Sequence, residues 1–405
     1  MGSFYNHNRR LYPYIFGGAI WLSWLISLLM GTGNFDVAGQ VIGTDYMMFY
    51  SAGSTLAEGA QSKLYDFEYQ NEKQLEILGR EPDGFFAYIN LPFLAWAYAP
   101  LSYLPYEFSF LAWCIINLGL LYAALNFLGL PKVFWLSLTF VPVFSNVSFG
   151  QNAFISLFAL SLIYYFWKQD KLFFAGFCLA LLLYKPQWVL GIGFLWLLNW
   201  HNDWKAMVGF TAGFTSLGAF LWLFMFEATL AYFDFAQNVL PTLASTGEFP
   251  IWHMHHPRGF LQLLLPDTLA DILWIISNLI GLFFFWKIWQ TRETESSDAF
   301  KPVFYSYAIL LTLWVTPHAM IYDWSLLLIP AVLLWQWKKQ LRPMLLNLSV
   351  MVWVGYLVST PLTVFQLSVA SFAIQISVLI FAYSTITLTK AALSQPFIIA
   401  NANQK

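Results

Sequence analysis

Charged residues are scarce in this chain of 405 residues. Lysine, arginine, aspartate and glutamate together make up 10% of it, whereas 59% of the residues are hydrophobic. Because about a quarter of the residues of a soluble domain are charged, this composition excludes a cytosolic enzyme and a disordered scaffold. The net charge of −2 leaves no excess of basic residues, which argues against nucleic acid as a partner. The composition is typical of an integral membrane protein.

Cysteine is rare, and nucleotide-binding motifs are missing. The two cysteines, Cys114 and Cys178, both lie in apolar stretches, where cysteine acts as a small core residue and no disulfide framework is implied. The sequence contains neither a Gly-x-x-x-x-Gly-Lys loop nor a Gly-x-Gly-x-x-Gly turn. A cytoplasmic active site driven by ATP or by a nucleotide sugar is therefore unsupported.

Apolar segments long enough to enter a membrane are abundant. The first, residues 11–30, has about the length of a bilayer crossing and follows Arg9 and Arg10, which favour a cytoplasmic start. Polar loops are expected at 32–86 and 227–258. The other apolar segments are expected at 86–104, 107–128, 132–147, 152–167, 171–184, 187–200, 206–226, 259–290, 302–316, 319–337, 343–358 and 363–388. The segment 259–290 is interrupted at Pro266-Asp267.

The distribution of lysine and arginine predicts an even number of crossings. Basic residues near both termini place both ends of the chain in the cytoplasm, so one of about thirteen segments does not cross. The short segment 132–147 is the best candidate for a re-entrant or half helix. We predict an all-α polytopic membrane protein, one domain over residues 1–405, with about 12 transmembrane helices and both polar loops on the extracytoplasmic side.

The first candidate site follows the first apolar segment. Residues 43–53 read Gly-Thr-Asp-Tyr-Met-Met-Phe-Tyr-Ser-Ala-Gly. An ionised Asp45 could accept a proton from an attacking hydroxyl, with Tyr46 beside it as a substrate-binding residue. Residues 46–58 predict an amphipathic helix whose aromatic residues face the membrane interface. Asp45 could instead cap that helix, and the two roles are compatible because a helix N-terminus stabilises a carboxylate.

Two further candidate sites carry cations or imidazoles. Lys185, between two apolar segments, could hold a phosphate or diphosphate, or it could snorkel from the end of a span. Arg258 with His255 or His256 could face an anion, because arginine binds two phosphate oxygens at once. A zinc site at these histidines lacks a cysteine or a close carboxylate, so we expect no bound metal; an ordinary interfacial loop is the other alternative.

The remaining candidates are a histidine and three amides. His318, at the end of an apolar segment, could stabilise charge on a leaving phosphate or orient a substrate hydroxyl, or it could be structural. The amides of Gln151 and Asn152 suit sugar hydroxyls but also cap helices, and Gln187 follows Lys185 closely. The predicted topology places all these residues on the extracytoplasmic side, where we expect any chemistry.

Seven short motifs follow one another along the chain. They are Asp45-Tyr46, Ser51-Ala52-Gly53, Lys63-Leu64-Tyr65-Asp66, a proline-punctuated segment from Tyr88 to Leu101, Ser148-Phe149-Gly150-Gln151-Asn152, Tyr184-Lys185-Pro186-Gln187 and Thr316-Pro317-His318. Their order and spacing resemble the polyprenol-phosphate-dependent glycosyltransferases of family 87, a group that includes phosphatidylinositol mannoside mannosyltransferases. The resemblance covers roughly residues 10 to 330.

This resemblance implies a GT-C fold with its active site at the extracytoplasmic face of a bacterial inner membrane. It implies an inverting transfer of a hexose, mannose-like, from a polyprenyl-phosphate-linked donor to a lipid or glycan acceptor. By match, Asp45 deprotonates the acceptor hydroxyl and His318 lies near the reacting centre. We expect that no cofactor is required, and a divalent cation held by Asp45 is the alternative.

The chain departs from the family pattern at two places that could shape the acceptor pocket. It has His255-His256 before Arg258, and it has Tyr-Ile-Asn-Leu-Pro at 88–92 where relatives often have Tyr-Pro-Pro. Two other functions also stay open. One is a secondary transporter or a lipid or glycolipid flippase, and the other is a non-catalytic membrane subunit. The long outer loop with an acid at its base favours the enzyme.

Overall fold

The computed structural model describes residues 11–245, 250–291, 297–337 and 339–394. Within these ranges every regular element is an α-helix or a 3-10 helix, and the few pairings of extended residues are isolated bridges. The predicted all-α class is therefore confirmed. The described residues form two compact units: unit 1 comprises residues 11–160, 177–185 and 210–245, and unit 2 comprises residues 161–176, 186–209, 250–291, 297–337 and 339–394. The single domain predicted over residues 1–405 stays a prediction.

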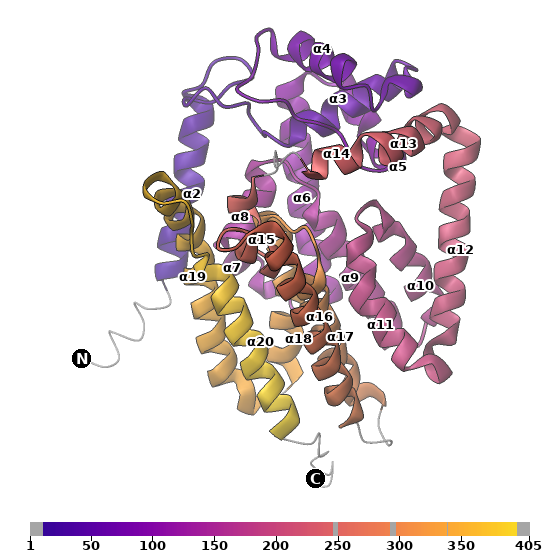
Figure 1. Cartoon of the computed structure of the whole chain (residues 1–405), viewed down its shortest axis with the longest axis vertical. Coiled ribbons are helices and arrows are strands. Elements are labelled where there is room, and N and C mark those ends of the chain that lie inside the picture. The colour runs from indigo at the N-terminus through magenta and orange to yellow at the C-terminus, as the bar shows by residue number, and fades with distance from the viewer. Residues whose placement is uncertain (1–10, 246–249, 292–296, 338, 395–405) are drawn as a thin grey trace. The chain divides into compact units, whose positions relative to one another are not determined.

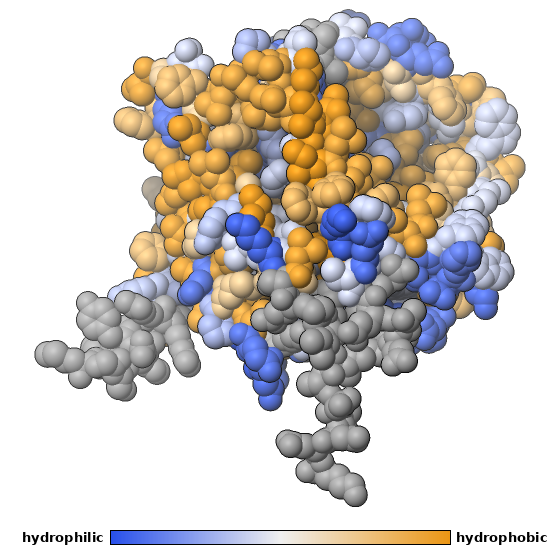
Figure 2. Space-filling model, turned by 60° about the horizontal axis from the view of Figure 1, so that its bottom comes forward, coloured by the Kyte–Doolittle hydropathy of each residue, from blue (hydrophilic) through white to orange (hydrophobic). Residues whose placement is uncertain are grey.

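Long apolar helices make the chain a membrane protein. Among the described residues, six helices are long and apolar enough to cross a bilayer: α2 (Tyr12–Leu29), α6 (Tyr106–Phe127), α12 (Trp200–Phe224), α16 (Asp267–Gln290), α19 (Arg342–Val369) and α20 (Ile376–Ser394). Broad continuous areas of the face in Figure 2 are hydrophobic. The number of about 12 spans stays a prediction. The cytoplasmic location of the termini also stays a prediction, and Arg9 and Arg10, which suggested it for the N-terminus, lie outside the described residues.

Shorter apolar helices account for the remaining predicted segments. They are α9 (Ala153–Lys168), α10 (Leu172–Ala180) with η4 (Leu181–Tyr184), η5 (Pro186–Val189) with α11 (Leu190–Leu198), α17 (Ser297–Val315), and η7 (Ile321–Leu327) with α18 (Leu328–Trp337). The predicted segment 86–104 is divided between α5 (Pro92–Tyr98) and η2 (Ala99–Tyr103). Prolines at the first or second position of α5, η2 and η5 explain these short elements, because proline begins a helix well but cannot continue one.

In unit 1 the first polar loop folds into helices around the start of α6 (Figure 1). α3 (Tyr46–Ala57) packs against α4 (Phe67–Leu78), α5, η2 and α6. Phe49 stacks on Tyr98 with ring centres 4.8 Å apart, and Tyr46 and Phe49 are fully buried. The prediction that these aromatic residues face the membrane interface is therefore wrong, because they form the core that joins the loop to α6.

The predicted re-entrant segment is broken into short helices. They are η3 (Pro131–Val133), α7 (Phe134–Ser137) and α8 (Val141–Ser148). α2 packs against α8, and the Trp21 indole donates to the backbone oxygen of Leu138, 2.8 Å away. These helices are too short to cross a bilayer, which agrees with a segment that does not span, while its re-entrant path stays a prediction.

The second polar loop contributes to both units. In unit 1, α13 (Phe226–Asn238) packs on η1 (Gln61–Lys63) of the first loop and is followed by α14 (Leu240–Ser245). The ring of Phe235 stacks on Tyr65, with centres 5.2 Å apart. In unit 2 the loop continues as η6 (Ile251–His253) and α15 (Pro257–Gln262).

In unit 2 the last two long helices, α19 and α20, lie side by side (Figure 1), and η8 (Lys339–Leu341) precedes α19. The predicted interruption near Pro266 is confirmed, because α15 ends at Gln262 and α16 begins at Asp267. The predicted division of the last segments at 358–363 is wrong. α19 continues through Pro361 to Val369, since packing against a neighbouring helix makes an interior proline tolerable in a membrane helix.

Candidate functional site

Asp45 stands at the junction of α3 with a turn from a distant part of the sequence. It occupies the N-cap position of α3, but its side chain makes no capping hydrogen bond. The Gln151 side chain instead donates from Nε2 to Asp45 Oδ2 over 2.9 Å, and the Tyr46 amide donates to the Phe149 oxygen over 3.0 Å. Asp45 itself is half-buried. The carboxylate is therefore oriented by the turn 148–152, whose amides, Gln151 and Asn152, the sequence predicts as substrate-binding residues.

Gly150 makes this close approach feasible. Its φ of +66° lies in the left-handed region that favours glycine, and an added Cβ would lie 2.4 Å from the Tyr46 Cβ. The Trp113 indole of α6 donates to the Gly150 oxygen over 2.8 Å. A side chain at this position would push the turn away from α3, so the glycine is a condition of the contact between Gln151 and Asp45.

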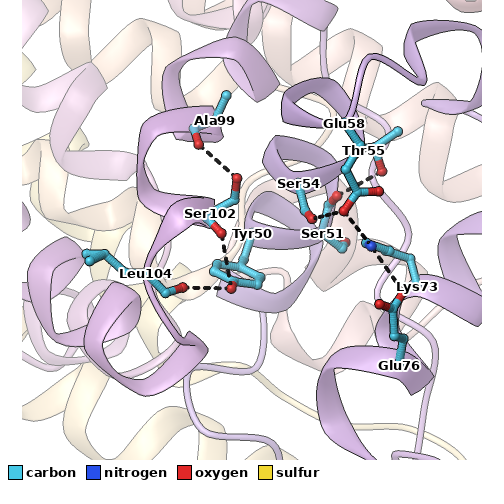
Figure 3. A network of polar contacts seen from close by, with 10 residues as sticks. All are labelled: Tyr50, Ser51, Ser54, Thr55, Glu58, Lys73, Glu76, Ala99, Ser102 and Leu104. Carbon is cyan, nitrogen blue, oxygen red and sulfur yellow. Dashed lines mark hydrogen bonds and ion pairs between the residues drawn. The ribbon is translucent and has the colours of Figure 1, made fainter.

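Ion pairs and hydrogen bonds hold α3 in place on its other sides (Figure 3). The Lys73 ammonium of α4 lies between Glu58, 2.6 Å away at the end of α3, and Glu76 at 3.0 Å. Burial alone would raise the pKa of Glu58, but bonds from Lys73 and Ser54 outweigh it and lower that pKa. The Tyr50 hydroxyl donates to the Leu104 oxygen over 2.8 Å. Asp45 thus begins a helix that is fixed at both ends.

The two other predicted substrate residues of unit 1 differ in their surroundings. The Tyr46 hydroxyl bonds with Ser109 of α6, and burial raises the pKa of Tyr46 above its ordinary value. Asn152 is fully buried, yet neither polar atom of its carboxamide has a hydrogen-bond partner. An unpartnered buried amide is costly, so Asn152 retains hydrogen-bonding capacity beside the Asp45–Gln151 pair.

Unit 2 brings together four of the other predicted residues. Met254 and Met320 form a bridge that places the second loop beside the residues after α17. The pKa of His256 lies well below its usual range, because burial and then the neighbouring His318 and Arg258 disfavour its charged form. The Gln187 side chain donates to the His318 oxygen over 3.5 Å. Gln187, His256, Arg258 and His318 therefore form one cluster.

His256 is a neutral imidazole with one free donor. It caps α15, where its Nδ1 accepts from the Gly259 amide over 3.3 Å. Since Nδ1 is the acceptor, the proton of the neutral ring lies on Nε2. Nε2 is buried and has no hydrogen-bond partner. An anionic or carbonyl oxygen would satisfy this donor.

His255 points into the helices of unit 2. Its Nδ1 is 2.6 Å from the Ser377 hydroxyl of α20, and its Nε2 is 2.9 Å from the Thr360 hydroxyl of α19. Burial, with a smaller contribution from His253, lowers the pKa of His255 to about 3. Both ring nitrogens are therefore occupied by hydroxyl groups of the two helices, as is typical of a structural histidine. These contacts do not support the predicted role of His255 toward a donor phosphate, which stays a prediction.

Arg258 and Lys185 occupy different surroundings. Arg258 binds both oxygens of Asp271 in α16, at 2.6 and 3.1 Å, and this pairing raises its pKa; about a third of its side chain remains exposed. Lys185 is half-buried and follows η4 at the end of its unit 1 segment. The structure thus places Lys185 in unit 1 and Arg258 in unit 2. In the described part of the chain, no three His, Cys, Asp or Glu side chains are arranged to hold a metal ion.

The sequence interpretation missed two buried asparagines beside Gln151. They are Asn117 of α6 and Asn146 of α8. Polar residues inside apolar segments cost free energy to bury and often have a function. The sequence shows both asparagines inside apolar segments, so their positions could have indicated a role. This indication is weak by itself, because similar segments also contain buried serines and threonines.

Comparison with known families decides the class of the protein. The model of glycosyltransferase family 87 matches residues 88–360, about two thirds of the chain. The chain belongs to glycosyltransferase family 87. No match is found among curated proteins or among solved structures. For this family 87 glycosyltransferase, the matched range includes Gln151, Lys185, Arg258 and His318 but begins after Asp45.

Proposed function

We propose that this family 87 enzyme transfers a mannose-like hexose from a polyprenyl-phosphate-linked donor to a lipid or glycan hydroxyl, with inversion, on a GT-C fold. The reaction would take place at the extracytoplasmic face of a bacterial inner membrane. Family membership supports the transfer of a sugar rather than transport or scaffolding. The apolar helices support a donor that stays in the membrane.

The observation that carries the proposal is the half-buried Asp45 carboxylate, oriented by Gln151 through Oδ2. The acceptor oxygen attacks the anomeric carbon while the bond from that carbon to the phosphate oxygen breaks. The bonding electrons leave with the polyprenyl phosphate, and the acceptor proton passes to Asp45. Attack opposite the leaving group inverts the anomeric centre.

The donor phosphate needs positive charge and hydrogen-bond donors, since negative charge grows on it as it leaves. In the proposal, Lys185 and Arg258 neutralise this negative charge, and His256 donates a hydrogen bond from Nε2 to a phosphate oxygen. Tyr46, Gln151, Asn152 and Gln187 are assigned to the substrates, and His318 to the reacting centre. His255 supports this region by holding α19 and α20. The proposal requires no cofactor, and a divalent cation at Asp45 is its alternative.

A donor panel tests the proposal. Purified enzyme is incubated with polyprenyl-phosphate mannose, glucose and galactose and with a lipid acceptor, and the products are analysed by mass spectrometry with and without EDTA. We expect a new glycoside of inverted configuration from one donor, formed equally well with EDTA. Loss of activity with EDTA and its return with Mg²⁺ would support the cation alternative. Movement of an unaltered donor across proteoliposomes, without glycoside, would overturn the proposal.

Removing the cationic side chains tests the phosphate assignment. We expect Lys185→Ala and Arg258→Ala to raise the apparent KM for the donor by about 10- to 100-fold, the value of a lost charge-assisted hydrogen bond. Lys132→Ala, which removes an exposed lysine before α7, is the matched control and should leave KM unchanged. An unaltered donor KM in both variants would remove the two residues from the phosphate site.

A further inference from the structure

Two asparagines are buried deep in unit 1 without a role in the proposed chemistry. Asn117 lies in the membrane-spanning helix α6 and Asn146 in the short helix α8, and neither is exposed at all. A carboxamide in such surroundings is unfavourable unless its polar atoms are bonded. The partners of the two side chains therefore indicate why they are there.

The two side chains bond to each other and to the turn that carries Gln151. Asn146 donates from Nδ2 to Asn117 Oδ1 over 3.0 Å, and Asn117 donates from Nδ2 to the Gln151 backbone oxygen over 3.3 Å. Asn146 Oδ1 accepts from the Ala153 amide over 2.8 Å. Because each carboxamide both donates and accepts, neither can rotate by 180° without losing bonds.

The backbone of Gln151 is held on both of its polar groups. Its amide donates to the Asn146 backbone oxygen over 2.8 Å, and its oxygen accepts from Asn117. The Gln151 side chain is then oriented as well, since its Oε1 accepts from the Asn152 amide over 3.2 Å. With Oε1 occupied, Nε2 faces Asp45 Oδ2 at 2.9 Å. The bonds donated by the three side-chain amides thus run in one direction, from Asn146 to Asn117, from Asn117 to Gln151 and from Gln151 to Asp45.

We infer that Asn117 and Asn146 are positioning residues that hold Gln151 so that its amide orients the Asp45 carboxylate for proton transfer. This inference rests on the proposed role of Asp45. The side chains of the two asparagines bond to each other and to the backbone of residues 151 and 153, so we assign them an effect that passes through Gln151 and no contact with substrate. Misplacing a catalytic group by about 1 Å can cost about 100-fold in rate, so their effect should appear in kcat rather than in donor binding.

A double-mutant cycle separates positioning from general stability. Gln151→Ala and Asn117→Leu are each expected to lower kcat by about 10- to 100-fold. Asn117→Leu, which keeps the Gln151 side chain, should leave the donor KM within about twofold. When the two changes are combined, kcat should fall no further than in Gln151→Ala alone, because Asn117 then has nothing to position. Asn146→Ala should behave in the same way.

Leu121→Ala is the matched control, since Leu121 is fully buried one turn further along α6. It should lower the thermal unfolding temperature without lowering kcat per folded molecule. If Asn117→Leu does not fold, Asn117→Ser takes its place in the cycle. Additive losses in the double variant, or an unchanged kcat in the single variants, would overturn the inference.

Asp45→Asn distinguishes this inference from the proposed function. If Asp45→Asn is inactive while the cycle is additive, the positioning inference alone fails. If Asp45→Asn keeps its activity, the proposed base fails and the positioning inference fails with it.

Discussion

Gly150 brings two backbone segments together at the candidate base. The turn that contains it approaches the first turn of α3 so closely that the Phe149 oxygen accepts from the Tyr46 amide. The left-handed φ of Gly150 and the 2.4 Å distance from its ideal Cβ to Tyr46 each disfavour any side chain there. A single residue of this kind determines whether Gln151 reaches Asp45.

Gly150→Ala should therefore damage both stability and activity. We expect the unfolding free energy to fall by at least about 1–2 kcal/mol, because the backbone must adopt a strained conformation or move, and kcat to fall with it. Gly119→Ala is the matched control, since Gly119 lies in α6 with open space at its Cβ, and it should be neutral or slightly stabilising. Thermal unfolding in detergent and activity assays measure both. An active, stable Gly150→Ala variant would contradict this account of the turn.

His255 makes stability depend on pH. Burial lowers its pKa to about 3 and that of His253 to about 4, whereas an unfolded histidine titrates near 6.5. As pH falls below 6.5, the unfolded chain binds protons before the folded one, so this stability is present above pH 6.5 and is lost below it.

We expect the unfolding free energy to fall by roughly 1 kcal/mol per pH unit between pH 6.5 and 4.5 for His255. His255→Gln should flatten this dependence, although it lowers stability at pH 7, while His201→Gln, at an exposed position, should leave the slope unchanged. Unfolding temperatures at pH 7, 6 and 5 measure it. Equal slopes in the native protein and in His255→Gln would show that His255 is not the group responsible.

Among the elements, α3 is the one whose placement matters most for the site. Its aromatic face is buried against α5, η2 and α6, and its polar end is held by Lys73 of α4. The sequence pattern predicted the helix and nearly its bounds. It did not predict the burial, because an amphipathic face looks the same whether it covers a membrane surface or a protein core.

Lys73→Met tests how firmly α3 is held. Only 10% of the Lys73 side chain is exposed, so its two ion pairs are screened less than surface pairs, and we expect a loss of roughly 1 kcal/mol in unfolding free energy. Lys63→Met removes an exposed pair with Asp66 and should change stability by less than about 0.5 kcal/mol. If both variants unfold at the same temperature, the Lys73 bonds do not hold α3.

The boundaries of other elements show where local signals are weak. Pro361 indicates a helix end in an isolated sequence, yet α19 continues past it; α19 packs against α18 and α20, and such packing makes an interior proline tolerable in a membrane helix. Pro266, by contrast, does separate α15 from α16. Pro266 is followed directly by Asp267, an acid in the first turn of α16, whereas Pro361 is followed by leucine and lies inside α19.

For the whole molecule, the sequence was sufficient for the class and the family. Low charge and long apolar segments predicted a helical membrane protein, and the motif order predicted family 87, which the match over residues 88–360 confirms. The partners of the site residues could not be predicted. Gln151 and Asp45 are 106 residues apart, and His255 and Ser377 are 122 apart, so only the folded chain brings each pair together.

The rate of sugar transfer by Asp45→Asn tests the central claim most directly. This change keeps the size of the side chain and an oxygen that can accept from Gln151, but it removes the basic carboxylate. We predict that kcat falls by about 100- to 10,000-fold while the donor KM is nearly unchanged. Asp83→Asn, which alters an exposed acid of the same loop, should retain full activity. Transfer by Asp45→Asn at a rate within about threefold of the native enzyme would contradict the assignment of Asp45 as the base.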